Sequence, residues 1–119
     1  MQWDTEAFSG FSSAKSWIPL NSDYDYLNVA LQEKDKASLL SKYKQLITLR
    51  NTEPILQYGS YEKLELKDEC IHFIRKYQES RINVLINFGK PYNFKLPNEA
   101  KILLGNIHLQ TNDFLIFKE

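Results

Sequence analysis

The second half of the chain alternates between apolar and polar residues. The clearest case is RINVLINF, in which Ile82, Val84, Ile86 and Phe88 lie at every second position, as a strand with one buried face requires. Similar short runs, each bounded by turn-forming residues, are YEKLEL, CIHFIRKY, YNFKL, KILL, IHLQ and FLIFK. Connections this short join antiparallel neighbours, because a parallel crossover needs about a dozen residues or more. From Ile55 onward the pattern predicts a small antiparallel sandwich or barrel of about six or seven strands.

The middle of the chain has a helical period instead. Asn28 can cap a short turn and Asp35 a longer helix. The apolar residues that then fall on one helical face are Leu39, Leu40, Tyr43, Leu46 and Ile47. Pro54 ends this pattern, because proline disfavours helical geometry at the residue before it. The first 27 residues show no sustained period, which at that length is typical of a functional loop or of a piece of a larger body.

Composition narrows the class of protein. The 119 residues carry 15 Lys and Arg against 15 Asp and Glu, so no net field attracts nucleic acid or an anionic membrane. No apolar run is long enough to span a bilayer, and Asp4 and Glu6 interrupt the start where an export signal would need an apolar run. The single cysteine, Cys70, excludes an internal disulfide and favours a cytoplasmic setting. His72 and His108 lack companions at ligand spacing, and the four glycines form no phosphate-binding cluster, so we expect neither a metal nor a cofactor.

Aromatic and acidic residues interleave near the start of the chain. The aromatic members are Trp3, Trp17, Tyr24 and Tyr26, and the acidic ones are Asp4, Asp23 and Asp25. Aromatic rings can stack on the apolar faces of a sugar while carboxylates accept hydrogen bonds from its hydroxyl groups. The competing interpretation is a surface loop whose aromatic side chains hold it on a core, and composition alone favours that interpretation.

Five sequence elements in the first sixty residues occur in a specific order and spacing. They are Met1-Gln2-Trp3-Asp4, Gly10-Phe11-Ser12, Trp17 with Asn21 and Tyr24, Asn28-Val29, and Leu49-Arg50 through Pro54 to Gly59. Together they resemble the C-terminal end of the oligo-1,6-glucosidases and related α-glucosidases, which are retaining glycoside hydrolases of the α-amylase superfamily. The second half of the chain agrees with that family in pattern only, and Thr111-Asn112-Asp113-Phe114 replaces the family's usual proline-containing turn, which leaves the register of the last hairpin open.

The resemblance implies a division of the chain at residue 53. Residues 1–53 would be the last loop and last helix of a truncated (β/α)8 catalytic barrel, and residues 54–119 an all-β C-terminal domain with a β-sandwich fold. A barrel needs roughly 250 residues, so most of it, with all the catalytic carboxylates, would lie before Met1. The parent would be a glycoside hydrolase acting on gluco-oligosaccharides, whereas this fragment alone would have no catalytic residue and a structural role.

The resemblance also indicates which substrates, sugar-contacting residues and protein partner to expect. Trehalose-6-phosphate hydrolase, dextran glucosidase and sucrose isomerase share these elements, so the substrate stays open. The candidate sugar-contacting residues in this chain are Gln2, Trp3, Trp17 and Tyr24. The expected partner is the missing barrel, and without it the apolar helix face could pair two copies into a homodimer. The alternative from another class, which rests on the interleaved aromatic and acidic residues rather than on the resemblance, is an independent carbohydrate-binding module that uses Trp3, Trp17, Tyr24 and Tyr26 as stacking platforms.

Overall fold

The computed structural model describes residues 1–119, which fall into two compact units, Met1–Thr48 and Leu49–Glu119. The structure as a whole is mostly antiparallel β-sheet with a few helices. None of the helices combines the length and the apolar character that a membrane span needs.

The first unit consists of irregular chain and short helices. The 3-10 helix η1 spans Ala7–Gly10, α1 spans Val29–Lys34, and α2 runs over Leu39–Thr52 and so extends beyond the first unit. Asn28 caps α1 as predicted, because its Oδ1 accepts a hydrogen bond from the Leu31 N–H at 2.9 Å. The prediction that Asp35 caps the longer helix is wrong. Asp35 accepts from the Ala37 N–H before the helix begins, and the Ser38 hydroxyl accepts from the Ser41 N–H at 3.1 Å at the start of α2.

The predicted apolar stripe of α2 is present in the sequence of the helix but is not buried. Leu39, Tyr43 and Ile47 are 66%, 58% and 56% exposed, and α2 contains no buried residue. The helix ends at Thr52, as the proline two residues later predicts. That proline then opens a further short helix, α3 over Pro54–Tyr58, where the sequence had suggested the start of the strand region. Proline suits the first turn of a helix because the N–H it lacks would have no partner there.

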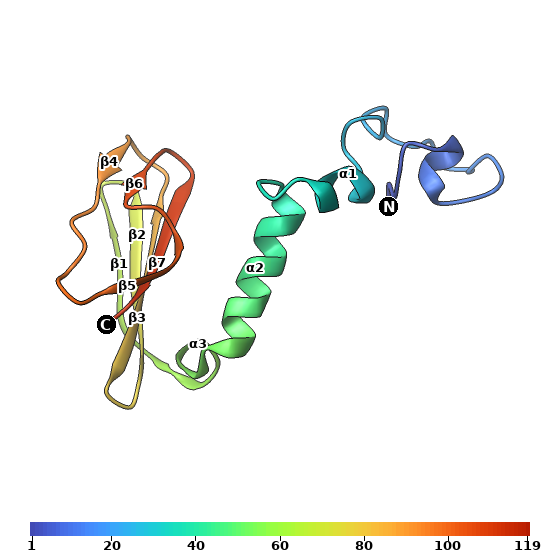
Figure 1. The fold of residues 1–119 in the computed structure, drawn as a ribbon. Coiled ribbons are helices and arrows are strands. Elements are labelled where there is room, and N and C mark those ends of the chain that lie inside the picture. The colour runs from blue at the N-terminus through green and yellow to red at the C-terminus, as the bar shows by residue number, and fades with distance from the viewer. The chain divides into compact units, whose positions relative to one another are not determined.

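All seven runs with a period of two contain strands. The larger sheet has the order β1-β2-β3-β7-β5 and the smaller the order β4-β6, with antiparallel pairing throughout (Figure 1). The strands are β1 (Ser60–Lys67), β2 (Cys70–Tyr77), β3 (Ser80–Asn87), β4 (Tyr92–Asn93), β5 (Lys101–Gly105), β6 (His108–Leu109) and β7 (Asp113–Lys118). The last hairpin that the sequence suggested, around residues 111–114, does not form, because its two strands lie in different sheets. Strand β6 pairs with β4, whereas β7 lies between β3 and β5 with Leu115 opposite both Leu85 and Gly105.

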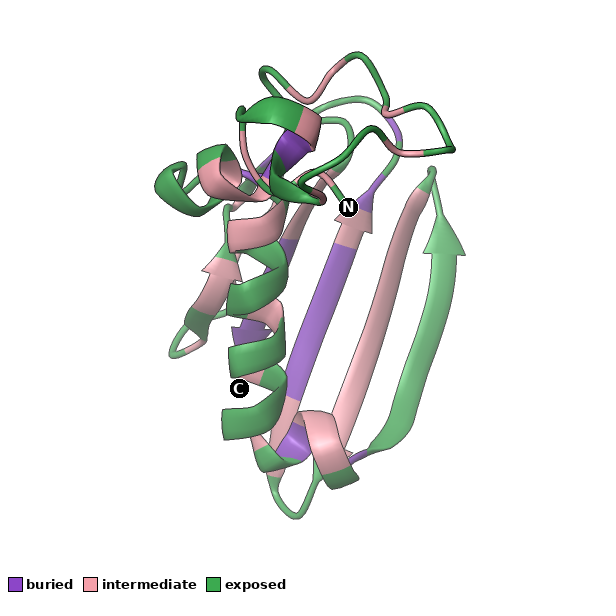
Figure 2. Ribbon diagram, turned by 90° about the vertical axis from the view of Figure 1, so that its right-hand side faces the viewer, coloured by how far each residue is buried: buried purple, intermediate pink, exposed green.

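The prediction that β3 buries only one face is wrong. Ile82 and Val84 are buried as expected, but Asn83, Leu85 and Asn87 on the opposite face are buried too, and Phe88 lies beyond the strand, 51% exposed. The reason is position: β3 is the central strand of the larger sheet. Figure 2 shows the consequence, with β3 buried, β2 intermediate and the outer strand β1 exposed along its whole length.

The hydrophobic core lies between the two sheets. Leu85, Leu115 and Phe117 of the larger sheet pack against Leu109 of the smaller one. The segments that flank the smaller sheet add Phe94, Leu96, Ala100 and Ile107 to this cluster. The ring of Phe94 lies 5.6 Å from that of Phe117. One face of the larger sheet is therefore covered near β3 and β7, and its β1 side is left open.

Candidate functional site

The beginning of the chain is held by hydrogen bonds to residues about twenty positions later. The Gln2 side chain donates to the Asp23 carboxylate at 2.7 Å and to the Asn21 carbonyl at 3.2 Å. The carbonyls of Gln2 and Trp3 accept from the first N–H groups of α1. These bonds fix residues 1–30 of the first unit as one folded loop, even though few of its side chains are buried.

The four candidate sugar-contacting residues all lie in the first unit, but the structure brings only two of them to the same hollow. Gln2 and Trp17 line a surface hollow of about 760 Å³, together with Phe11, Lys15 and Ile18. Trp3 and Tyr24 do not line it. Trp17 is 92% exposed, so both faces of its indole are open to a flat ligand.

Two of the three acidic residues named in the same segment, Asp4 and Asp23, are engaged in local structure. Asp4 accepts a hydrogen bond from the Glu6 N–H at 2.9 Å, and Asp23 accepts from Gln2. Gly10 has a left-handed φ of +62°, and a Cβ at this position would meet the Asp4 carboxylate at 2.4 Å. The element Gly10-Phe11-Ser12 therefore needs its glycine for both conformation and space. These contacts account for Asp4 and Gly10 as parts of a tight loop.

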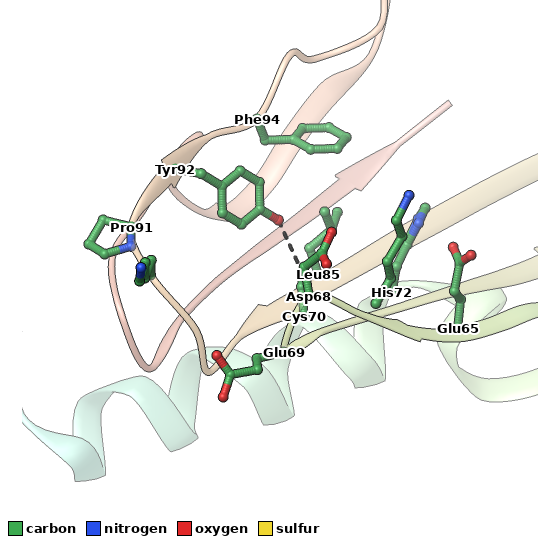
Figure 3. A pocket seen from close by; sticks show the side chains of 11 residues that line it. Glu65, Asp68, Glu69, Cys70, His72, Leu85, Pro91, Tyr92 and Phe94 are labelled. Atoms are coloured by element: carbon green, nitrogen blue, oxygen red, sulfur yellow. Dashed lines mark hydrogen bonds between the residues drawn. The ribbon is translucent and has the colours of Figure 1, made fainter.

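A second hollow, which the sequence did not suggest, lies on the open side of the sheet core. It has a volume of about 640 Å³ and joins residues of β1 and β2 to the segment around β4. Figure 3 shows Tyr92 and Phe94 on the β4 side, and His72 and Glu65 on the side of β2 and β1. The sequence does contain a signal for it: Cys70 and His72, like Tyr92 and Phe94, are two residues apart, and such pairs share one face of an extended chain.

A thiol and a phenol meet in this second hollow. The Cys70 Sγ lies 3.2 Å from the Tyr92 hydroxyl (Figure 3). Burial, with the hydrogen bond to Cys70 as a further cause, raises the pKa of Tyr92 to about 12. Tyr92 is therefore neutral at pH 7 and keeps its O–H as a donor or acceptor for the hollow.

Both ring nitrogens of His72 are already used. Nε2 lies 2.9 Å from the Asn83 Oδ1, an acceptor, so Nε2 carries the proton. Nδ1 is then free to accept from the Lys63 Nζ at 3.4 Å, and Lys63 also pairs with Glu65 at 2.8 Å. His108 in turn contacts the Asn93 Oδ1. No group of three or more His, Cys, Asp or Glu side chains is arranged to hold a metal ion.

Both hollows can accommodate small polar molecules, and they differ in their walls. The first combines an open indole with the Gln2 amide. The second combines two partly buried aromatic rings with three carboxylates and two ammonium groups, from Glu65, Asp68, Glu69, Lys67 and Lys90. Neither hollow is lined by a charged cluster of one sign, so both suit a neutral ligand better than an ionic one.

Comparison with known proteins assigns the fold to a family. Residues 1–59 match the family model described as the catalytic domain of alpha amylase. The chain is 35% identical over 116 residues to "Probable oligo-1,6-glucosidase 3" of Bacillus subtilis (strain 168), a match that covers 92% of the chain. It is 32% identical over 117 residues to the oligo-1,6-glucosidase of Bacillus cereus, again over 92% of the chain. The chain belongs to the alpha-amylase family.

Solved structures of this alpha-amylase family share the fold of the chain. Bacillus licheniformis trehalose-6-phosphate hydrolase is 26% identical with a TM-score of 0.83. The trehalulose synthase MutB from Pseudomonas mesoacidophila MX-45 is 28% identical with a TM-score of 0.84. Each match covers 98% of this chain and 24% of the other. The chain likewise spans 21% of the length of the two oligo-1,6-glucosidases.

Proposed function

We propose that this chain is the C-terminal part of an α-glucosidase that hydrolyses α-1,6-linked or related α-linked gluco-oligosaccharides, and that the part described is non-catalytic. The observation that carries the proposal is the match to oligo-1,6-glucosidases over 92% of this chain and only 21% of their length. On this hypothesis the catalytic portion of the parent is the principal partner of the chain.

The proposed division assigns residues 1–53 to the end of a (β/α)8 barrel and residues 54–119 to a β-sandwich domain. Two observations support it. The catalytic-domain model matches residues 1–59, and the larger sheet begins at Ser60. The smaller sheet and its flanking segments pack against one face of the larger sheet through Leu85, Leu109 and Phe117, which is how two layers form a sandwich.

The proposed role of the chain is to stabilise the parent rather than to carry out its chemistry. A retaining glycosidase needs two carboxyl groups about 5 Å apart, one as nucleophile and one as acid and base. The parent would supply that pair from its remaining length. The exposed apolar residues on α2, Leu39, Tyr43 and Ile47, support a role in packing against such a body.

Enzyme assays with the purified 119-residue chain test this hypothesis. We expect no hydrolysis of isomaltose or of an aryl α-glucoside above the rate without protein. Hydrolysis that Asp4→Asn or Asp25→Asn abolishes would contradict the proposal, because it would locate a catalytic carboxylate in this chain. Contaminating activity is recognised by its persistence in both variants.

The second candidate function is an independent carbohydrate-binding module. The 92% exposure of Trp17 beside the first hollow favours it. Calorimetric titration with isomaltose and maltotriose distinguishes the two hypotheses. Micromolar binding that Trp17→Ala removes would favour the module, provided that Tyr58→Ala binds as before. Tyr58 is a suitable control because it is 70% exposed, does not line the hollow and lies in the second unit.

A further inference from the structure

Strand β1 is the outer strand of the larger sheet, and its open edge is unusually well suited to pairing. All eight residues of Ser60–Lys67 are exposed, and β1 has a strand neighbour on one side only. An edge of this kind presents free N–H and C=O groups to any second strand. Each of the two outer strands has one irregularity, between Tyr61 and Lys63 in β1 and between Ile102 and Leu104 in β5. Strand β5 still offers the poorer edge, because it has only five residues and ends in a left-handed Gly105.

The two faces of β1 carry different chemistry. Leu64 and Leu66 are 73% and 72% exposed on one face. They lie next to Phe73 and Ile71 of β2, so they extend an apolar row that begins in the sheet. Lys63, Glu65 and Lys67 alternate with the leucines and occupy the opposite face. Charged residues often protect an edge from pairing, but protection works by repulsion between like charges, whereas this row alternates in sign.

The alternating signs of the charges on β1 make the strand complementary to a second, antiparallel copy of itself. When two β1 strands run antiparallel about a two-fold axis through Leu64, Lys63 of each copy lies opposite Glu65 of the other. Both Lys63–Glu65 contacts then join opposite charges, and the two Leu64 side chains meet on the apolar face. Moving the axis by one residue either way places Lys63 opposite Lys63, or Glu65 opposite Glu65. Moving the axis by two residues, to Leu66, again pairs opposite charges, Glu65 with Lys67, but then only residues 65–67 of the two strands overlap, against residues 61–67 when the axis passes through Leu64. Charge pattern and overlap together therefore favour the Leu64-centred register.

We propose that β1 is a self-complementary interface through which two copies of this chain join their larger sheets edge to edge, centred on Leu64. The occupant of the edge is thus a second copy. Lys63 and Glu65, which already pair within one strand at 2.8 Å, can exchange partners across the interface without leaving either charge unpaired. This surface is distinct from the apolar face of α2, and the proposal does not depend on the proposed function.

Complementary charge reversals test the proposal directly. Lys63→Glu alone places acid opposite acid in the dimer, and Glu65→Lys alone places ammonium opposite ammonium. An equimolar mixture of the two variants restores two attractive pairs in the heterodimer. The original chain should dimerise at high micromolar concentration in sedimentation velocity. Each single variant should dissociate at least about tenfold more readily, and the mixture should recover the original affinity within about threefold.

Other outcomes overturn the proposal. A chain that stays monomeric at the highest soluble concentration has no such interface. Association that is equally strong in the original chain and in both single variants would place the contact elsewhere, and Tyr43→Ser would then test the α2 face. A mixture of the variants that fails to associate, although both show the far-ultraviolet spectrum of the original chain, would exclude the Leu64-centred register.

Discussion

The two units of this chain differ in what they bury. The second unit contains every buried apolar residue: Ile55, Ile82, Val84, Leu85, Leu109, Leu115, Ile116 and Phe117. In the first unit the buried residues are Ser9, Asn28 and Ser38, all of them polar, while Trp17 is 92% exposed. The second unit thus has a hydrophobic core, and the first is held by hydrogen bonds.

That difference indicates how much each unit depends on contacts outside itself. Ordering a residue costs about 1 to 2 kcal/mol of backbone entropy, whereas a typical hydrogen bond returns only about 1 kcal/mol net. Burial of apolar surface makes up the difference in most domains. The first unit lacks this contribution from its own residues, so we infer that its fold depends on a further apolar surface. The proposed parent enzyme would provide one.

The largest expected effect follows from removing a ring from the core of the second unit. Phe117 is 1% exposed and packs against Phe94. Phe117→Ala should lower the free energy of unfolding of that unit by about 3 to 5 kcal/mol, because the cavity cannot fully collapse. Phe11→Ala in the first unit, where the ring is 58% exposed, is the matched control and should change stability by less than about 0.5 kcal/mol.

Urea unfolding can follow the two units separately. Both tryptophans, Trp3 and Trp17, lie in the first unit, so their fluorescence reports on that unit alone. Amide NMR signals of β3 and β7 report on the second unit, which contains all the strands, and serve as the sheet signal. We expect the fluorescence transition at lower urea than the loss of this sheet signal. Coincident transitions, or equal losses in the two phenylalanine variants, would show that the chain unfolds as one unit.

The second largest loss of stability is expected from replacing a buried asparagine, and each unit contains one whose side chain forms several hydrogen bonds. Asn87 is 1% exposed, and its amide donates to the carbonyls of Lys90, Leu109 and Gln110 while its Oδ1 accepts from the Gly89 N–H. Asn87→Ala leaves several buried groups without a partner and should cost about 2 to 3 kcal/mol.

Asn28 provides the comparison within the first unit. It is 2% exposed, caps α1 and also donates to the Tyr24 carbonyl at 2.8 Å. Asn28→Ala should cost about 1 kcal/mol, as loss of a helix cap usually does. Its effect should be visible in tryptophan fluorescence and absent from the sheet signal. A larger loss of unfolding free energy in Asn28→Ala than in Asn87→Ala would contradict the inference that the second unit depends more on its own buried contacts than the first.

Hydrogen exchange sharpens the comparison without any mutation. Amide groups of β3 and β7 are central in the larger sheet and should exchange only on global unfolding of the second unit. Amide groups of the first 25 residues should exchange faster by at least about a hundredfold, since opening them exposes no apolar core. Slow exchange throughout those residues in a monomer would contradict the inference that the first unit depends on further contacts.

Periodicity predicted the strands well because the period of two follows directly from strand geometry. Every run found in this way contains a strand, and the family resemblance rested on residues that the structure places in a tight loop and a helix cap, such as Gly10 and Asn28. Burial was harder to predict. The alternation around Ile82 and Val84 is compatible with one covered face, and only the strand order, with β3 in the centre, explains why Asn83 and Asn87 are buried as well.

The candidate sites, like burial, depend on three-dimensional packing that local sequence patterns do not specify. Residue types alone grouped Gln2, Trp3, Trp17 and Tyr24, but the path of the loop decides which side chains line one hollow, and it selects Gln2 and Trp17. The second hollow joins β2 to residues twenty positions later in the chain. Its contact between Cys70 and Tyr92 depends on how the smaller sheet packs on the larger, which local patterns do not specify.

The smallest expected effect is a dependence of stability on pH that differs between the units. Glu62 of β1 accepts both hydrogen bonds of the Arg81 guanidinium, at 2.5 and 2.9 Å, and this interaction holds the pKa of Glu62 below its ordinary value of 4.5. A lowered pKa in the folded state means that the stabilisation is complete above the ordinary pKa and is lost as the pH falls through the lowered one. The side chains are exposed, so the loss should be small.

Glu33 of the first unit provides the matched control. Its hydrogen bond with Lys44 lowers its pKa in the same way, but no sheet is joined by that pair. Glu62→Gln should lower the urea midpoint of the sheet signal slightly at pH 7, and the gap to the original chain should close as the pH falls below 4.5 and through the lowered pKa of Glu62. Glu33→Gln should leave this signal unchanged at every pH. A gap for Glu62→Gln that stays constant as the pH falls far below 4.5 would show that the glutamate acts through packing of its side chain rather than through its charge.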